Sequence, residues 1–141
     1  MPQTTVEIRT LGNTSLAVGS SEARTLTIDR AQDVGGMGLG FNGGELLLLA
    51  IGGCYSNDIF REAGKRGMKI RGVQVEVSAD WGGEPVRAQH VSYSVKVEAD
   101  ATEVEILELI QHTDRIAEIP NSLRFPTEVR LAVRSAVVAK S

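Results

Sequence analysis

GGELLLLAIGGCYSND, residues 43 to 58, is the stretch of sequence that decides the fold. Its leucine-rich middle and its lack of proline predict a buried helix. Cys54, near the end of the stretch, is the only cysteine among the 141 residues. A lone thiol cannot by itself form an internal disulfide or a metal site. It is therefore either a small apolar core residue or a reactive group.

The helical spacing around Cys54 indicates a boundary between an apolar and a polar surface. At about 100° per residue, the thiol shares one stripe of the helix with six side chains. Three of them are aliphatic and precede it, and three are polar and follow it: Leu47, Ala50, Ile51, Asn57, Asp58 and Arg61. This position suits the floor of a pocket. Arg61 could stabilise a thiolate, but Asp58 lies nearer and would oppose it.

Two glycines precede the thiol directly. Gly52 and Gly53 within a helix cost about 1–2 kcal/mol relative to two alanines, so close packing must compensate for them. We expect a second helix to approach here. An identical helix from a partner subunit is the simplest candidate.

The chain before this helix predicts a small sheet and a loop. Short alternating segments around residues 6–8, 16–18 and 26–28, separated by turn residues, predict an antiparallel meander. Residues 35–44 contain six glycines and predict a loop that leads into the helix. A dinucleotide site is not indicated, because no βαβ alternation surrounds these glycines.

The chain after the helix predicts a long hairpin, further helices and a final strand. Residues 69–81 and 86–99 alternate and are joined by turn residues. Thr102 and Glu105 form a capping box for a second helix, a short helix starts near Pro120, and 127–138 alternates as a closing strand. Locally paired strands with few, long helices predict an α+β fold.

Composition limits the function classes. The length predicts one domain, residues 1–141, and the net charge of −3 without a charge block argues against nucleic acid. The longest apolar run, residues 46–51, is too short to cross a bilayer. A cytoplasmic location is expected. His90 and His112 have no acidic partner at metal-ligand spacing, so neither a metal nor another cofactor is expected.

The segment from Gly43 to Cys54, the glycine-rich loop before it and the strand pair, helix and strand after it resemble the OsmC/Ohr family of osmotically inducible and organic-hydroperoxide-resistance proteins. The resemblance covers residues 24–138. It implies an OsmC-like fold in which antiparallel sheets wrap around two long central helices of an intertwined homodimer. It also implies that Cys54 is the peroxidatic cysteine, supported by an arginine and a glutamate.

The sequence departs from the family pattern at these supporting positions. Ile119 occupies the position of the family's second, resolving cysteine, so an external thiol would have to reduce an oxidised Cys54. The family's glutamate position corresponds to Gly44, and Glu45 is one residue closer to the cysteine. Glu45 could serve its own site if the helix starts after it, serve the partner's site, or simply favour the first turn of the helix. Arg30 and Arg24 are the arginines that precede the loop.

Two functions follow from these observations. The first is a thiol-dependent reductase of organic hydroperoxides in which Cys54 is the nucleophile, with Glu45 and Arg30 as candidate supporting residues. Its partners would be a second copy of the chain, a small hydroperoxide and an external thiol reductant. The alternative is a non-catalytic OsmC-like dimer that binds an apolar small molecule at the subunit interface.

Overall fold

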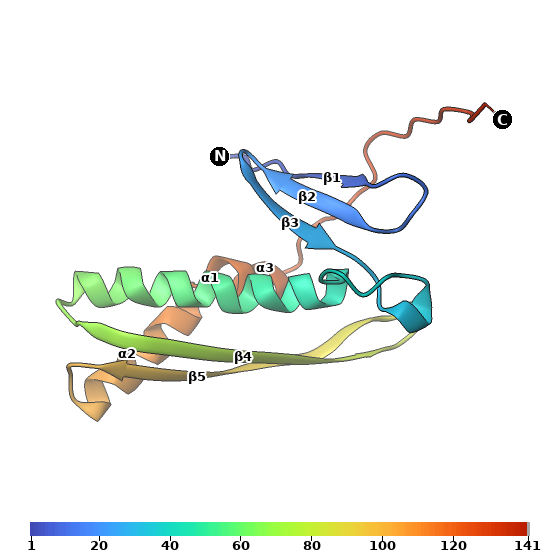
Figure 1. The fold of residues 1–141 in the computed structure, drawn as a ribbon. Helices are drawn as coiled ribbons and strands as arrows, with labels where there is room; N and C mark the ends of the chain where they lie inside the picture. Colours follow the sequence, from blue (N-terminus) through green and yellow to red (C-terminus); the bar gives the residue numbers. More distant parts are fainter. Residues whose placement is uncertain (141) are drawn as a thin grey trace.

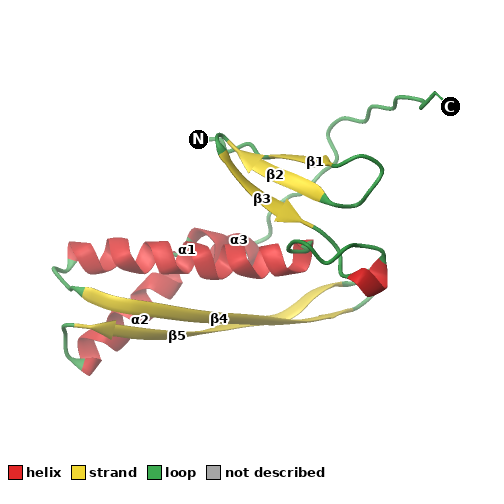
Figure 2. Cartoon of the chain, viewed as in Figure 1, coloured by secondary structure: helices red, strands yellow, loops and turns green. Residues whose placement is uncertain are grey.

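The computed structural model describes residues 1–140 and has an α+β architecture, as the sequence predicts (Figure 1). One long helix lies between a small sheet and a long hairpin, one shorter helix lies behind it, and another crosses behind the hairpin (Figure 2). In chain order the elements are β1 (Glu7–Thr10), β2 (Ala17–Ser21), β3 (Arg24–Ile28), the 3-10 helix η1 (Gln32–Val34), α1 (Gly43–Lys65), β4 (Ile70–Gly82), β5 (Arg87–Ala99), α2 (Glu103–Ile116) and α3 (Glu118–Arg124).

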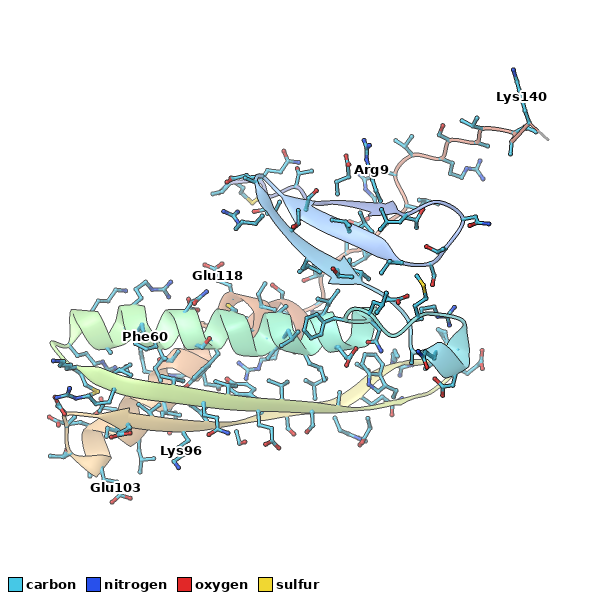
Figure 3. All side chains as sticks on the ribbon, in the orientation of Figure 1. Arg9, Phe60, Lys96, Glu103, Glu118 and Lys140 are labelled. Carbon is cyan, nitrogen blue, oxygen red and sulfur yellow. The ribbon has the colours of Figure 1, made fainter. Side chains whose placement is uncertain are left out.

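The β4–β5 hairpin provides the apolar surface on which the helices pack. Its antiparallel register pairs Val73 with Val97, Val75 with Val95, and Val77 with Tyr93. These residues are half-buried, whereas most of the residues between them are exposed and polar, because successive side chains of a strand point to opposite faces. Lys96 shows the outer face and points away from α1 (Figure 3).

The core lies between this hairpin and α1, α2 and α3. Its centre consists of five buried residues: Tyr55, Ile59, Ala63, Leu109 and Ala117. Tyr55 and Tyr93 bring the helix and the hairpin together through rings whose centroids are 5.2 Å apart and tilted by 57°. The Tyr55 hydroxyl donates to the Ile110 carbonyl at 2.9 Å, which satisfies the polar end of a fully buried side chain.

Both long helices begin with a capping box. At the start of α1 the Glu45 N–H donates to the Asn42 side chain at 2.8 Å, and the Asn42 N–H donates to Glu45 at 2.9 Å. Thr102 and Glu105 make the equivalent pair of bonds at the start of α2. The predicted capping box of α2 is therefore confirmed, and the capping box of α1 was not predicted.

The predicted meander and glycine-rich loop are also confirmed, and Asp29 joins them. β1, β2 and β3 pair antiparallel in this order. Asp29 directly follows β3 and is 2% exposed. Its carboxylate accepts the N–H groups of Arg30 at 2.8 Å, Met37 at 3.0 Å and Leu39 at 3.1 Å, and the Ser15 hydroxyl at 3.4 Å. One buried carboxylate thus fixes the path of the loop that leads to α1.

One expectation about the C-terminal half is wrong. Residues 127–138 form no strand, because no other strand pairs with them, and their apolar side chains are exposed. Leu107 is 56% exposed, whereas Leu109 and Thr113 fill the inner face of α2. Among the described residues, no helix is long and apolar enough to span a membrane.

We expect Asp29→Asn to lower the melting temperature by several degrees at pH 7. The pKa of Asp29 lies below its ordinary value of 3.8, mainly because the carboxylate accepts the Leu39 N–H. Burial raises this pKa, but the N–H groups of Arg30 and Met37 lower it further. The ionised Asp29 therefore stabilises the folded protein at pH values above 3.8. This stabilisation is lost as the pH falls through the lower pKa that Asp29 has in the folded protein.

Thermal unfolding at several pH values tests this expectation. The difference in melting temperature between wild type and Asp29→Asn should be constant near neutral pH and should shrink in strong acid. Asp33→Asn, in the same segment but with an exposed carboxylate, is the control. Equal melting temperatures of wild type and Asp29→Asn at pH 7 would contradict the role of Asp29.

Candidate functional site

Cys54 lies on α1 at the predicted change from an apolar to a polar surface. Its thiol is half-buried, and the sulfur donates to Asp58 Oδ2 at 3.7 Å. Asp58 Oδ1 in turn accepts Arg61 Nη1 at 3.0 Å. The acid therefore stands between the thiol and the arginine on the same stripe of the helix. Among residues 1–140, no arginine forms a hydrogen bond with the Cys54 sulfur.

A buried carboxylate extends this polar stripe to α2. The Glu62 side chain is 7% exposed and accepts Arg61 Nε at 3.1 Å and Lys65 Nζ at 2.9 Å. Its other oxygen lies 2.7 Å from His112 Nε2. Lys65 foremost, then His112 and Arg61, lower the pKa of Glu62 to about 2. Sequence reasoning missed this cluster, although the spacing of Glu62 and Lys65 on one helix was a signal for part of it.

The apolar half of the stripe borders a cleft of about 330 Å³. Leu47 and Ile51 line it, as the predicted aliphatic wall requires, whereas Ala50 is exposed. The remaining lining residues come from β5 and α3: Ala88, Val91, Tyr93, Pro120, Leu123 and Arg124. Ile119 is also part of α3, so its segment lies beside this cleft.

A hydrogen-bonded group at one end of the cleft was not predicted. Asp114 on α2 accepts the Tyr93 hydroxyl and Arg124 Nη2, the latter at 2.5 Å. Burial, reinforced by Asp114, raises the pKa of Tyr93. Burial opposes the charge of Asp114, but Tyr93 and Arg124 together hold the pKa of this acid below its ordinary value. The group ties α2, α3 and β5 together where the cleft ends.

The two glycines have different surroundings. A Cβ on Gly52 would lie 3.2 Å from Val77 Cγ2 and 3.5 Å from Val75 Cγ1. At Gly52 the close approach is therefore made by β4 of the same chain, and the expected second helix is not the cause. A Cβ on Gly53 would meet no described atom within 4 Å. Gly53 borders a groove of about 500 Å³ between α1 and β4.

Within one chain, the candidate supporting residues Glu45, Arg24 and Arg30 form no hydrogen bond with the Cys54 thiol. α1 begins at Gly43, which excludes the possibility that the helix starts after Glu45. Glu45 instead stabilises the first turn of the helix through the capping box with Asn42. Nine residues of continuous helix place Glu45 and Cys54 about half a turn apart, on opposite faces. Arg24 is exposed and pairs with Glu22 at 3.5 Å. Arg30 is exposed next to Asp29.

Among residues 1–140, no group of three or more His, Cys, Asp and Glu side chains is placed to hold a metal ion. Asp58 and Glu62, the acids that follow the thiol on α1, form ion pairs with Arg61 and Lys65. The polar part of the site is thus a set of paired charges.

A sequence model described as OsmC-like protein matches residues 36–132. No curated protein matches the chain. Among solved structures, an OsmC-like protein from Mycoplasma pneumoniae is 17% identical with a TM-score of 0.76, and 87% of this chain and 88% of that chain are covered. At this identity the likeness shows the fold.

Two hydroperoxide resistance proteins are also similar in fold. One from Legionella pneumophila is 15% identical with a TM-score of 0.60, over 88% of this chain and 90% of that chain. A putative organic hydroperoxide resistance protein from Vibrio cholerae, with captopril bound in one of its active sites, is 18% identical with a TM-score of 0.60. The match covers 88% of this chain and 85% of that chain.

We expect Gly52→Val to destabilise the protein by about 1–3 kcal/mol, because the added side chain would overlap Val75 and Val77. Gly64→Val is the matched control. It makes the same change on the same helix, at a position where an added Cβ meets no described atom within 4 Å. Urea unfolding of the variants gives the comparison, and equal midpoints for both would exclude close packing at Gly52.

Proposed function

The chain belongs to the OsmC-like protein family, and on this basis we propose that it reduces organic hydroperoxides with Cys54 as the nucleophile. The observation that supports this proposal best is the position of the thiol. Cys54 is half-buried on the stripe of α1 whose apolar part, Leu47 and Ile51, lines the 330 Å³ cleft. An aliphatic substituent of a hydroperoxide would fit against this wall.

The proposed reaction has three steps. The Cys54 sulfur attacks the terminal peroxide oxygen, the O–O bond breaks, and the organic part leaves as an alcohol after it takes up the thiol proton. Cys54 becomes a sulfenic acid. A first external thiol then forms a mixed disulfide and releases water, and a second one releases Cys54 as a thiol. The external thiol takes the place of the resolving cysteine, because Ile119 cannot form a disulfide.

We propose that the working unit is a homodimer and that each chain is a single OsmC-like domain, residues 1–141. Three exposed apolar surfaces support a dimer: the groove beside Gly53, the face of the meander that contains Ile8 and Leu26, and the C-terminal residues around Leu131. In such a dimer, Glu45 and Arg30 are proposed to act on the partner's thiol. We also propose that the protein acts in the cytosol.

The alternative, a dimer that binds an apolar small molecule without turnover, is favoured by one observation. The acid Asp58, and no arginine of residues 1–140, contacts the sulfur, and a carboxylate does not favour the thiolate that attack on a peroxide requires. In this case the 330 Å³ cleft would be a binding site only.

We expect the purified protein to consume cumene hydroperoxide when a dithiol reductant is supplied. Cys54→Ser should consume it no faster than the reductant alone, since no other described residue supplies a thiol. Peroxide consumption is followed over time for both proteins.

Intact-mass measurement after peroxide treatment separates the two functions. A gain of one oxygen atom by the wild type, reversed by dithiol, supports the reductase. An unmodified Cys54 in excess oxidant, together with equal peroxide consumption by both proteins, would contradict it and support the binding function.

We expect a particle of twice the 15.1 kDa chain mass, and we expect Gly53→Leu to dissociate it. In a single chain this substitution meets open space and improves helix propensity by about 0.5–1 kcal/mol, so loss of the dimer would locate a partner at Gly53. Gly64→Leu is the control. Sedimentation velocity measures the mass, and a dimer unaffected by Gly53→Leu would place the interface elsewhere.

A further inference from the structure

A chain of polar contacts leads from the thiol across α1 to α2. Cys54 donates to Asp58, Asp58 pairs with Arg61, Arg61 pairs with Glu62, and Glu62 meets His112. Each carboxylate in it is largely buried, with side-chain exposures of 11% for Asp58 and 7% for Glu62. The Arg61 side chain, by contrast, is 49% exposed and is held at both ends of its guanidinium.

The contact between Cys54 and Asp58 has a defined electrostatic sign. A carboxylate that accepts the S–H bond favours the protonated thiol, and its negative charge opposes a negative charge on the sulfur. Because Asp58 is largely buried, water screens this effect less than it would at the surface. Arg61 acts in the opposite direction, since its positive charge offsets that of Asp58.

Arg61 is not free to turn toward the sulfur. Its Nη1 and Nε are bound by Asp58 and Glu62, at 3.0 Å and 3.1 Å. Glu62 first, and then Asp58, raises the pKa of Arg61, which therefore stays charged. The two acids thus fix the position of the Arg61 guanidinium.

We propose that Asp58 holds Cys54 in the unreactive thiol form, and that Arg61, fixed between Asp58 and Glu62, sets how strongly it does so. The inference rests on the proposed function in taking Cys54 as the reactive group. It adds a restraint on that group: the Cys54–Asp58 contact has to open, or the charge of Asp58 has to be neutralised, before the thiol reacts rapidly.

The other charged groups near this series of polar contacts come from three helices. α1 contributes Lys65, which pairs with Glu62, and α2 contributes His112, on the other oxygen of Glu62. Glu118, labelled in Figure 3, begins α3. Its charge acts on Arg61. The face of β4 under α1 is apolar at Val73, Val75 and Val77. Asp58 is therefore the acid that contacts the sulfur, and Arg61 is its direct counter-charge.

The test is the rate at which iodoacetamide alkylates Cys54, followed by intact mass as a function of pH. This reaction consumes thiolate and needs no hydroperoxide. Asp58→Asn keeps the shape of the side chain and removes its charge. We expect alkylation about 3- to 10-fold faster than wild type at pH 7, with the ratio falling toward one at high pH, where both thiols are ionised.

Arg61→Gln should act in the opposite direction. It leaves the charge of Asp58 without its counter-charge, so alkylation at pH 7 should be slower by about 2-fold or more. Asp33→Asn changes the net charge as Asp58→Asn does, at an exposed position in another segment, and should react as wild type does.

The opposite signs separate electrostatics from loosened structure. A substitution that merely loosened α1 would make Cys54 more accessible and its alkylation faster. Faster alkylation in both variants would therefore overturn the inference. An Asp58→Asn variant that reacts at the wild-type rate or more slowly would also overturn it. Hydroperoxide consumption by the same proteins reports separately on the proposed function: wild type and Asp58→Asn without turnover, but with the expected alkylation rates, would refute the reductase and leave the restraint standing.

Discussion

The packing of α1 on the inner face of the β4–β5 hairpin is the interaction on which the rest of the structure depends. Tyr55 and Ile59 are completely buried there, and each such side chain contributes about 1.5–3 kcal/mol when it leaves water. Gly52 allows the helix to approach β4 so closely that a Cβ would already be in tight contact with Val77. This packing fixes the rotation of α1 about its axis, and the rotation decides where each residue near Cys54 points.

Once the rotation is fixed, the surroundings of the thiol follow from helical spacing. Leu47 and Ile51, before Cys54, face the cleft beside α3, and Asp58 and Arg61, after it, continue into a charge cluster whose carboxylates are largely buried. The same helix therefore places apolar side chains before the thiol and a largely buried acid, Asp58, in contact with it.

The sequence was sufficient for those features that depend on neighbours in the chain. The meander, α1, the hairpin and the capping box of α2 all follow from local periodicity and turn residues, and the order of Asp58 and Arg61 near the thiol follows from spacing on one helix. Contacts between elements could not be predicted in this way. Glu62 meets His112 fifty positions away, and Tyr93, Asp114 and Arg124 come from three elements. The predicted strand at 127–138 failed for a related reason, because alternation marks a segment that can pair but supplies no partner strand.

The most direct test of the central claim, that Cys54 is the group that reacts with hydroperoxide, is to trap its oxidised form. The protein is treated with one equivalent of an organic hydroperoxide in the presence of dimedone, which adds to sulfenic acids, and is then digested and analysed by peptide mass spectrometry. We expect a dimedone adduct on the peptide that contains Cys54, and its loss when the hydroperoxide is omitted. A peptide that carries no adduct, with its thiol still free for alkylation, would contradict the account.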